Sequence, residues 1–337
     1  MKDIENYSLK GHNTFGIEAR CSRFLEFESV DEAREVAAIV RAARVPYIII
    51  GGGSNLLLTR DFEGMVIHSA IDSCTINGCD VVCGSGMAWD RVVEQSLEAG
   101  LRGAENLSLI PGDVGASAVQ NIGAYGAEVK DLIVSVEAVE IATGRVCTFS
   151  NADCQYGYRD SRFKHEWKNK YLITYVTYRL QPIADGEAPL NISYGNISEE
   201  LRRQGISNPT ARQLREVIIG IRRQKLPDPE VMGNAGSFFM NPVVSREKYE
   251  QLAAEFPNMP HYYIDEQHEK IPAGWMIDQC GWKGRRLGCA GVHDKQALVL
   301  VNCGGATGEE IVTLCRTIQQ DVSRKFGIDI HPEVNII

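Results

Sequence analysis

Two glycine-rich stretches constrain the fold of this chain more than any other feature. The first, Ile50–Leu57 (IGGGSNLL), directly follows Val45–Ile50, a run typical of a short buried strand. The second is Glu105–Gly126 (ENLSLIPGDVGASAVQNIGAYG). Glycine admits positive φ and lets a ligand approach the main chain, and consecutive exposed N–H groups form a nest that binds a pyrophosphate. Two such loops, separated by an α/β segment of about 50 residues, predict a cradle for a dinucleotide.

The two loops do not match the common nucleotide motifs. No Gly-Lys-Ser/Thr follows either stretch, as a Walker loop requires, and the G-x-G-x-x-G fingerprint of nicotinamide dinucleotide sites is absent. Ser54, Asn55, Ser117 and Asn121 can add side-chain hydrogen bonds to a ligand. On residue chemistry alone, a tight turn remains possible for the first stretch and a structural loop between strands for the second.

The first part of the chain mixes helices with many short strands, which predicts an α+β fold. A capping box at Ser29–Glu32 begins a helix with Val36 and Val40 on its apolar face. Glycine is a common residue just after a helix, so a second helix is expected to stop at Gly100. The segments with these patterns are a helix at Trp89–Ala99, a hairpin at Asp131–Phe149 turning at Thr143–Gly144, and a strand at Tyr171–Leu180.

The pattern changes after Leu180. Residues 181–209 are rich in Pro, Gly, Asn and Ser and are predicted to form a connecting loop. Three amphipathic helices follow, and we expect a domain boundary near residue 208. The first begins at Thr210 and ends before Pro227. The second spans Ser245–Phe256, and the third begins at the capping box Thr307–Glu310.

Length and composition predict a globular protein with more than one domain. The chain has 337 residues, with 44% hydrophobic and 23% charged residues, which suits two or three domains. No apolar run approaches the roughly 20 residues that cross a bilayer, and Met1–Arg20 lacks the apolar stretch of a signal peptide. We therefore expect a cytoplasmic protein that binds no membrane.

The charge balance argues against nucleic acid as a partner. The formal net charge is −9, whereas a nucleic-acid binder needs a basic face. Local basic clusters can still bind a phosphorylated small ligand, although a solvated surface is the favoured interpretation of both. They are Arg222, Arg223 and Lys225, and Lys283, Arg285 and Arg286.

The cysteines predict neither a metal site nor disulfides. The ten cysteines are scattered and include no C-x-x-C pair, which is the spacing that structural zinc favours. The closest group, Cys74, Cys79 and Cys83, falls on a segment that alternates like a strand. We therefore expect buried free thiols that pack as small hydrophobic groups, and no metal.

Seven motifs in one order carry a resemblance to a known family. The chain resembles the UDP-N-acetylenolpyruvoylglucosamine reductases from Asn13–Phe15 (NTF) to the C-terminus. The motifs are Gly51–Leu57, Ile110–Gly112 (IPG), Gln120–Gly126 (QNIGAYG), Tyr156–Ser161 (YGYRDS), Asn234–Phe239 (NAGSFF), Ala273–Asp278 (AGWMID) and Pro332–Val334 (PEV).

The resemblance implies a fold and a domain order. The family has an FAD-binding domain of the vanillyl-alcohol-oxidase type in two α+β subdomains, followed by a smaller α/β substrate domain. Carried over to this chain, the FAD domain is 1–207, with subdomains of about 1–68 and 69–207, and the substrate domain is 208–337. The last strand, at about 328–337, is expected to return to the FAD domain.

The same resemblance implies the reaction and its cofactors. Non-covalently bound FAD and NADPH as hydride donor are expected to reduce UDP-N-acetylglucosamine enolpyruvate to UDP-N-acetylmuramate, in a bacterial enzyme that is a monomer. The implied FAD contacts are Gly51, Gly52, Gly53, Ser54, Asn55, Leu56, Pro111, Gly112, Gly115, Ser117, Asn121, Ile122 and Gly123.

Three residues are implied to be catalytic. Ser237 is the expected proton donor, Arg159 offers a planar fork that matches a carboxylate, and Glu333 is expected to act protonated, as a hydrogen-bond donor. The implied contacts to the UDP-sugar are Tyr158, Tyr194, Lys225 and Asn241. Tyr194 lies between Leu180 and Thr210, in what resembles the extra loop of the family's first type.

Two positions depart from the family pattern. Asp113 stands where a small or neutral residue is more usual, and Ala118 where many relatives have proline. An acid beside a pyrophosphate is unfavourable unless it points away. Two other functions stay open: an oxidase of the same FAD fold acting on a hydroxy acid or sugar, and a sugar-nucleotide sensor that has lost its flavin.

Overall fold

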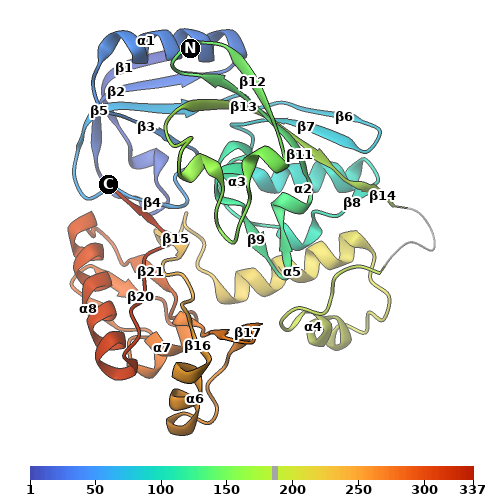
Figure 1. Cartoon of the computed structure of the whole chain (residues 1–337), viewed down its shortest axis with the longest axis vertical. Helices are drawn as coiled ribbons and strands as arrows, with labels where there is room; N and C mark the ends of the chain where they lie inside the picture. Colours follow the sequence, from blue (N-terminus) through green and yellow to red (C-terminus); the bar gives the residue numbers. More distant parts are fainter. Residues whose placement is uncertain (184–188) are drawn as a thin grey trace. The chain divides into compact units, whose positions relative to one another are not determined.

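The computed structural model describes residues 1–183 and 189–337 (Figure 1). The chain forms two compact units. Unit 1 comprises Met1–Tyr7, Cys21–Gly52 and Phe62–Gln224, and unit 2 comprises Ser8–Arg20, Gly53–Asp61 and Lys225–Ile337. The change from one unit to the other thus occurs within the first glycine stretch.

The first sheet of unit 1 carries the strand that leads into the glycine triplet. Its order is β1 (Lys2–Ser8), β2 (Arg20–Phe27), β5 (Phe62–Ser69), β3 (Tyr47–Ile50). Strands β2 and β3 both pair in parallel with β5. Helix α1 (Val30–Ala43) buries Val36 and Val40 with Leu25 and Ile67 of the sheet, as the apolar stripe predicted.

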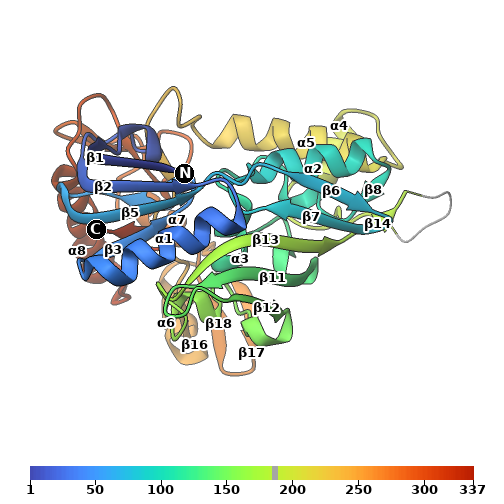
Figure 2. The ribbon, with the colours of Figure 1, turned by 90° about the horizontal axis from the view of Figure 1, so that it is seen from above.

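The second sheet of unit 1 is antiparallel. Its order is β12 (Val146–Ser150), β11 (Ile133–Glu140), β13 (Tyr171–Arg179), β7 (Asp80–Gly84), β6 (Cys74–Asn77). The predicted hairpin is confirmed as β11 and β12, and the predicted strand as β13. Helix α1 lies beside β11 and β13 (Figure 2), and Val139 and Leu172 of these strands pack in one cluster with its apolar residues.

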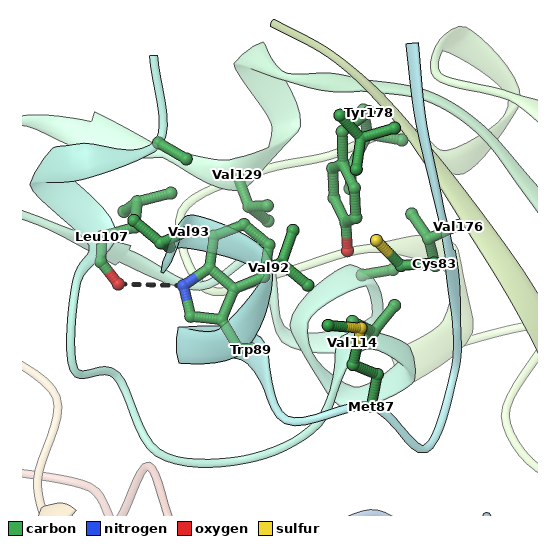
Figure 3. Packing of buried hydrophobic residues seen from close by; sticks show 14 of the residues in the cluster. Cys83, Met87, Trp89, Val92, Val93, Leu107, Val114, Val129, Val176 and Tyr178 are labelled. Atoms are coloured by element: carbon green, nitrogen blue, oxygen red, sulfur yellow. Dashed lines mark hydrogen bonds between the residues drawn. The ribbon is translucent and has the colours of Figure 1, made fainter. Parts of the chain in front are cut away.

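The opposite side of this sheet holds a core with helices α2 (Trp89–Glu98) and α3 (Val114–Gln120) (Figure 3). Trp89 is 1% exposed, meets Tyr178 edge-on at 5.4 Å between ring centroids, and donates its indole N–H to the Leu107 carbonyl at 2.9 Å. A buried indole gains most when its N–H has a partner. The second glycine stretch begins between α2 and α3 and includes α3, so this core fixes its first part.

The remaining elements of unit 1 are short strands and helices around the second glycine stretch. They are β8 (Leu101–Arg102), β9 (Gly123–Ala124), β10 (Ala127–Glu128), β14 (Gln181–Pro182), α4 (Ile197–Arg203), α5 (Ala211–Lys225) and the 3-10 helices η2 (Glu105–Leu107), η3 (Val129–Asp131), η4 (Ala152–Cys154) and η5 (Arg162–Lys164).

Unit 2 is built around a four-stranded sheet in the order β15 (Asn234–Ser237), β21 (Val299–Asn302), β20 (Ala290–Val292), β19 (Arg286–Leu287). Helix α8 (Gly308–Phe326) packs against β20 and β21. The other elements of the unit are η1 (Lys10–His12), β4 (Leu56–Leu57), β16 (Val243–Ser245), α6 (Arg246–Glu255), β17 (Tyr262–Asp265), β18 (His268–Lys270), α7 (Ala273–Gln279) and β22 (Asn335–Ile336).

The helix caps predicted at Thr210 and Thr307 are confirmed, and Ser245 forms a further cap that was not predicted. Thr307 and Glu310 form the reciprocal capping box of α8, Ser245 caps α6, and the Thr210 hydroxyl accepts from the Gln213 N–H at 3.2 Å. The box at Ser29 is only half present. Ser29 accepts from the Glu32 N–H, but the Glu32 carboxylate accepts from the Glu28 N–H at 2.7 Å instead of from Ser29.

Three other expectations need correction. The predicted loop 181–209 contains helix α4, whose Ile197 and Leu201 pack against Leu214 and Ile218 of α5. Strand β3 is half-buried along its length, not buried. All ten cysteines lie in the described part of the chain and are free thiols, but only four of them are buried; five are half-buried and Cys289 is exposed.

The division into units differs from the boundary predicted near residue 208. Helix α5 belongs to unit 1, whereas Ser8–Arg20 and Gly53–Asp61 belong to unit 2. Strand β22 pairs in parallel with β4, within unit 2. Compactness alone does not say which part binds cofactor or substrate, so the assignment of 1–207 and 208–337 stays a prediction. Within the described ranges, no helix combines the length and apolar character needed to cross a membrane.

Candidate active site

The two glycine stretches lie against each other in unit 1. A Cβ added to Gly51 would lie 3.0 Å from the Ala116 Cβ, and one added to Gly52 would lie 3.1 Å from Oδ1 of Asp113. Side chains at both positions would push the stretches apart. The bare backbone of Gly51 and Gly52 therefore lets residues about sixty positions apart in the chain approach closely.

Packing around α2 and α3 holds the second stretch in place. The Gly112 carbonyl accepts from the Trp89 N–H at 2.9 Å, and the Gly115 N–H donates to the Ser85 carbonyl at 2.9 Å. A Cβ on Gly115 would lie 3.0 Å from the Ser85 Cβ. Glycine at 115 is thus explained by its close approach to β7 and the turn after it, while Pro111 beside it is exposed.

Two predicted cofactor contacts have their side chains engaged inside the protein. Ser117 is 1% exposed, and its hydroxyl donates to the Val114 carbonyl at 2.7 Å and lies 3.0 Å from the Tyr178 hydroxyl. The Asn121 amide donates to the Gly157 carbonyl at 2.7 Å and its oxygen accepts from the Lys130 N–H at 3.1 Å. Both side chains organise the loop, and a contact between either one and a cofactor stays a prediction.

Backbone carbonyls of the second stretch hold the Arg159 side chain. Its guanidinium donates to the carbonyls of Asn121, at 3.3 Å, and Gly123. Gly123 must lack a side chain here, because its Cβ would lie 2.7 Å from Nη1 of Arg159. Arg159 itself has φ +55°, a left-handed conformation that costs free energy in a non-glycine residue. Strained backbone of this kind is typical of functional residues, whose side chains must point in one fixed direction.

The loop that contains Tyr194 is attached to the end of the second stretch. A Cβ on Gly126 would lie 3.3 Å from Cβ and Cδ2 of Tyr194. The Asn106 amide donates to the carbonyls of Tyr125 and Asn191, both at 2.9 Å. Tyr194 is 46% exposed and Tyr158, which lies beside the Arg159 guanidinium, is 50% exposed. Both tyrosines are thus partly accessible on unit 1.

A buried charge cluster in unit 1 was missed at the level of sequence. Arg215 of α5 donates two hydrogen bonds to Asp90 of α2, at 2.7 and 2.9 Å, and its side chain is 8% exposed. Arg222, expected on a solvated surface, is half-buried instead, and its Nε is shielded from solvent. Burial lowers the pKa of Arg222. Lys225, at the end of α5, is exposed as expected.

Asp113 has a titratable partner, the ring of His68. Its carboxylate faces the Gly51–Gly52 backbone instead of pointing away, and Nε2 of His68 lies 3.6 Å from its Oδ2. Burial opposes a charge on the His68 ring, but Asp113 and Glu26 together raise its pKa above the ordinary value.

Unit 2 brings two of the three predicted catalytic residues onto neighbouring backbone. Ser237 is the last residue of β15, and the next carbonyl, that of Phe238, accepts from the Glu333 N–H at 2.8 Å. The Asn55 amide donates to the Glu333 carbonyl at 3.3 Å. Ser237, Glu333 and the first glycine stretch therefore meet within one unit, although 278 residues separate Asn55 from Glu333.

The other predicted residues of unit 2 lie around the same strands. A Cβ on Gly53, at φ +68°, would lie 2.0 Å from the His12 carbonyl oxygen, so only glycine fits there. Leu56 is buried in β4, and Ser54 is half-buried. The Asn241 oxygen accepts from the Ala273 N–H at 2.9 Å, at the start of α7. Arg159 belongs to unit 1, so its meeting with Ser237 and Glu333 stays a prediction.

The residues of unit 1 fit a bound dinucleotide such as FAD. Gly51 and Gly52 are half-buried and carry no side chain, and glycine backbone of this kind binds diphosphates through its N–H groups. The negative charge of Asp113 opposes such a ligand, and the neighbouring His68 supplies a compensating positive charge when protonated.

Comparison with known proteins agrees with this geometry. The family model described as "FAD binding domain" matches residues 22–150, and the model described as "UDP-N-acetylenolpyruvoylglucosamine reductase, C-terminal domain" matches residues 228–337. The chain is 52% identical over 99% of both chains to the UDP-N-acetylenolpyruvoylglucosamine reductase of Bacteroides fragilis, and 47% identical over 98% of both chains to that of Pseudomonas aeruginosa.

Solved structures support the same fold. The UDP-N-acetylenolpyruvylglucosamine reductase of Thermus caldophilus matches with a TM-score of 0.68 at 23% identity, covering 99% of this chain and 98% of that one. The 6-hydroxy-D-nicotine oxidase of Arthrobacter nicotinovorans matches with a TM-score of 0.57 at 14% identity, covering 97% and 86%. The full-length identity to curated relatives is decisive: this chain belongs to the UDP-N-acetylenolpyruvoylglucosamine reductase family.

Proposed function

We propose that this chain is the reductase that uses NADPH and FAD to convert UDP-N-acetylglucosamine enolpyruvate to UDP-N-acetylmuramate, in the synthesis of peptidoglycan precursors. The observation that carries the proposal is the 52% identity over 99% of both chains to a reductase of that name. The approach of the two glycine stretches in unit 1 supports it independently, because this backbone suits a dinucleotide.

The reaction places separate demands on the protein. When bound, FAD relays a hydride from NADPH to the terminal carbon of the enolpyruvyl group. Negative charge then develops at the alpha carbon and spreads into the substrate carboxylate, so fixed donors are needed there. Arg159 is the proposed donor, since a guanidinium remains charged and matches a carboxylate in shape. The Asn121 and Gly123 carbonyls that accept from it fix its direction.

Ser237 is the proposed proton donor to the alpha carbon. A hydroxyl is a weak acid, but a carbanion is a strong enough base to take its proton. The support from this structure is positional: Ser237 ends β15, opposite Val299 of β21, and is exposed. A side chain at the end of a paired strand is well placed for such a transfer.

Glu333 is the proposed partner of Ser237. A carboxylate beside a developing enolate would repel it, so we propose that Glu333 acts in its protonated form as a hydrogen-bond donor. Its backbone is fixed on both sides, by the Phe238 carbonyl and by the Asn55 amide. Glutamine can donate a hydrogen bond and alanine cannot, so Glu333→Gln should keep more activity than Glu333→Ala; equal losses would contradict protonation.

Binding of the UDP-sugar is assigned to Tyr158, Tyr194, Lys225 and Asn241. The enzyme is assigned to the family's first type, in which a tyrosine loop closes over the nucleotide. The attachment of the Tyr194 loop to Gly126 and its exposed ring support this assignment. We further propose a monomeric enzyme of the bacterial cytoplasm with non-covalently bound FAD. Gel filtration and release of free flavin on denaturation test these two properties.

Substrate-dependent consumption of NADPH tests the proposed function. We expect the yellow purified protein to oxidise NADPH when UDP-N-acetylglucosamine enolpyruvate is added, with one UDP-N-acetylmuramate formed per NADPH. Oxygen uptake with sugars or hydroxy acids, and no response to the enolpyruvyl compound, would instead identify an oxidase of the same fold. A colourless protein that binds no added FAD would identify a sensor without flavin.

A further inference from the structure

A row of four charged side chains in unit 1 ends at the first glycine stretch. Lys2 of β1 pairs with Glu26 of β2, whose other oxygen lies 2.9 Å from Nδ1 of His68 on β5. On the other side of the ring, Nε2 lies 3.6 Å from Oδ2 of Asp113. The side chains of Glu26, His68 and Asp113 are 7%, 13% and 13% exposed. This arrangement is too well shielded to be an ordinary surface pair.

The ring of His68 faces a carboxylate at each nitrogen. A neutral imidazole has one N–H and can serve only one of them, whereas an imidazolium donates at both nitrogens. With the ring protonated, Lys2, Glu26, His68 and Asp113 carry two positive and two negative charges. With the ring neutral, one negative charge is left over. Burial opposes protonation, yet the two carboxylates raise the pKa of His68.

The uncompensated negative charge lies next to the Gly51–Gly52 backbone because Asp113 does. Its two carboxylate oxygens lie 3.1 and 3.3 Å from where the Cβ atoms of Gly52 and Gly51 would be. This is the backbone to which the proposed function assigns the FAD diphosphate. A diphosphate bound to this backbone would lie near the Asp113 carboxylate, and two neighbouring anions repel each other unless a cation lies beside them.

We propose that His68 is a positioning residue for the dinucleotide: its imidazolium, fixed by Glu26, pairs with Asp113 and so keeps the Gly51–Gly52 backbone receptive to a diphosphate. This inference rests on the proposed function, since it needs FAD at the glycine stretch. It also gives the acid at position 113 a partner that compensates its charge.

The direction of the pH response follows from the charges. The pKa of His68 is raised above about 6.5, its ordinary value. The positive charge is therefore fully present below that pH and is lost as the pH rises through the raised pKa. The titratable groups packed around the ring are Glu26 from β2, Lys2 from β1 behind it, and Asp113 before α3. FAD should be held more weakly at alkaline pH.

The rate of FAD release from the purified holoenzyme tests the inference. Flavin fluorescence after dilution is followed at about pH 6 and about pH 9, for the wild type, His68→Gln, Asp113→Asn and the double variant. The matched control is His165→Gln, because His165 lies 2.7 Å from Asp160 on the surface of the same unit, with 62% of its side chain exposed. Circular dichroism at both pH values separates flavin release from unfolding.

We expect wild type and His165→Gln to release FAD about tenfold faster at the higher pH. Asp113→Asn should release it slowly at both, His68→Gln rapidly at both, and the double variant like Asp113→Asn. If the wild type released FAD at the same rate at both pH values, or if Asp113→Asn kept the wild-type pH dependence of release, the inference would be overturned while the proposed function would stand. If His68→Gln does not fold, the Asp113→Asn comparison decides alone. A protein that binds no FAD at all would overturn the proposed function and this inference together.

Discussion

At the scale of single residues, the clearest feature is the fixed orientation of the Arg159 side chain. A side chain with several rotatable bonds needs neighbours that fix it, and here two carbonyls accept from the guanidinium while a glycine leaves room for it. The role of Gly123 is therefore steric, and it differs from that of Gly53, where positive φ and contact with the His12 carbonyl exclude a side chain.

Gly123→Ala should displace the guanidinium of Arg159. The added Cβ would lie 2.7 Å from Nη1 and 2.9 Å from the Ala127 carbonyl oxygen, which requires one of them to move. We expect kcat for the enolpyruvyl substrate to fall by about tenfold or more, measured in the NADPH assay. The control is Gly157→Ala, whose Cβ would meet Asp160 at an ordinary 3.5 Å. Similar losses in both variants would show that Arg159 is not the cause.

Ser237→Ala should separate the two halves of the reaction. Loss of the proton donor leaves flavin reduction by NADPH unchanged but slows reoxidation of the reduced flavin by substrate by about 10²-fold or more, both measured by stopped-flow absorbance. Ser245→Ala is the matched control in the same unit, because it removes only the N-cap of α6 and should cost stability alone. Unchanged rates for both halves in Ser237→Ala would exclude it as the proton donor.

At the scale of helices and strands, the sequence predicts those features that depend on interactions between residues close together in the chain. The starts of α5 and α8 are predictable because a capping side chain and the N–H from which it accepts lie three residues apart, and α6 is predictable from its amphipathic pattern. Helix α4 was missed because its seven residues have no side-chain cap and gain most from burying Ile197 and Leu201 against α5. At Ser29 the capping box is incomplete because the Glu32 carboxylate accepts hydrogen bonds from the Met1 amino group and the Glu28 N–H instead.

The pairing of α2 with α5 through Asp90 and Arg215 was also beyond sequence reasoning, because 125 residues separate the partners. Asp90→Ala should destabilise unit 1 by roughly 3–5 kcal/mol, since it leaves a buried guanidinium without its partner. Chemical unfolding measures this loss. Asp72→Ala, which removes a surface pair with Arg91 whose side chains are 50% and 48% exposed, is the control and should change little.

The same pair predicts an acid response. Burial would raise the pKa of Asp90, but Arg215 and the Leu109 N–H hold it below the ordinary value. Its stabilising contribution is thus fully present above about pH 4 and is lost as the pH falls through the lowered pKa. The difference in unfolding free energy between wild type and Asp90→Ala should therefore shrink in acid. A difference that stays constant below that pH would contradict the assignment.

At the scale of the whole molecule, the fold class and the glycine stretches were predictable, while the meeting of distant residues was not. Two stretches rich in glycine, serine and asparagine indicate backbone binding of a dinucleotide, and this indication does not depend on where the stretches lie in the fold. Nothing in the spacing of Ser237 and Glu333 predicts that Glu333 pairs with the backbone beside Ser237, and only the family resemblance singled them out. The acid at 113 stands out in the sequence, but its partner His68 does not, because 45 residues and five elements of structure lie between them.

One anaerobic experiment tests the central claim, that the glycine stretches hold a flavin which delivers a hydride to an enolpyruvyl sugar nucleotide. The bound flavin is reduced with one equivalent of NADPH without oxygen, and UDP-N-acetylglucosamine enolpyruvate is then added. We predict that the absorbance of oxidised flavin returns in full and that UDP-N-acetylmuramate forms in equal amount. Flavin that stays reduced with this compound, yet is reoxidised when air is admitted, would contradict the account.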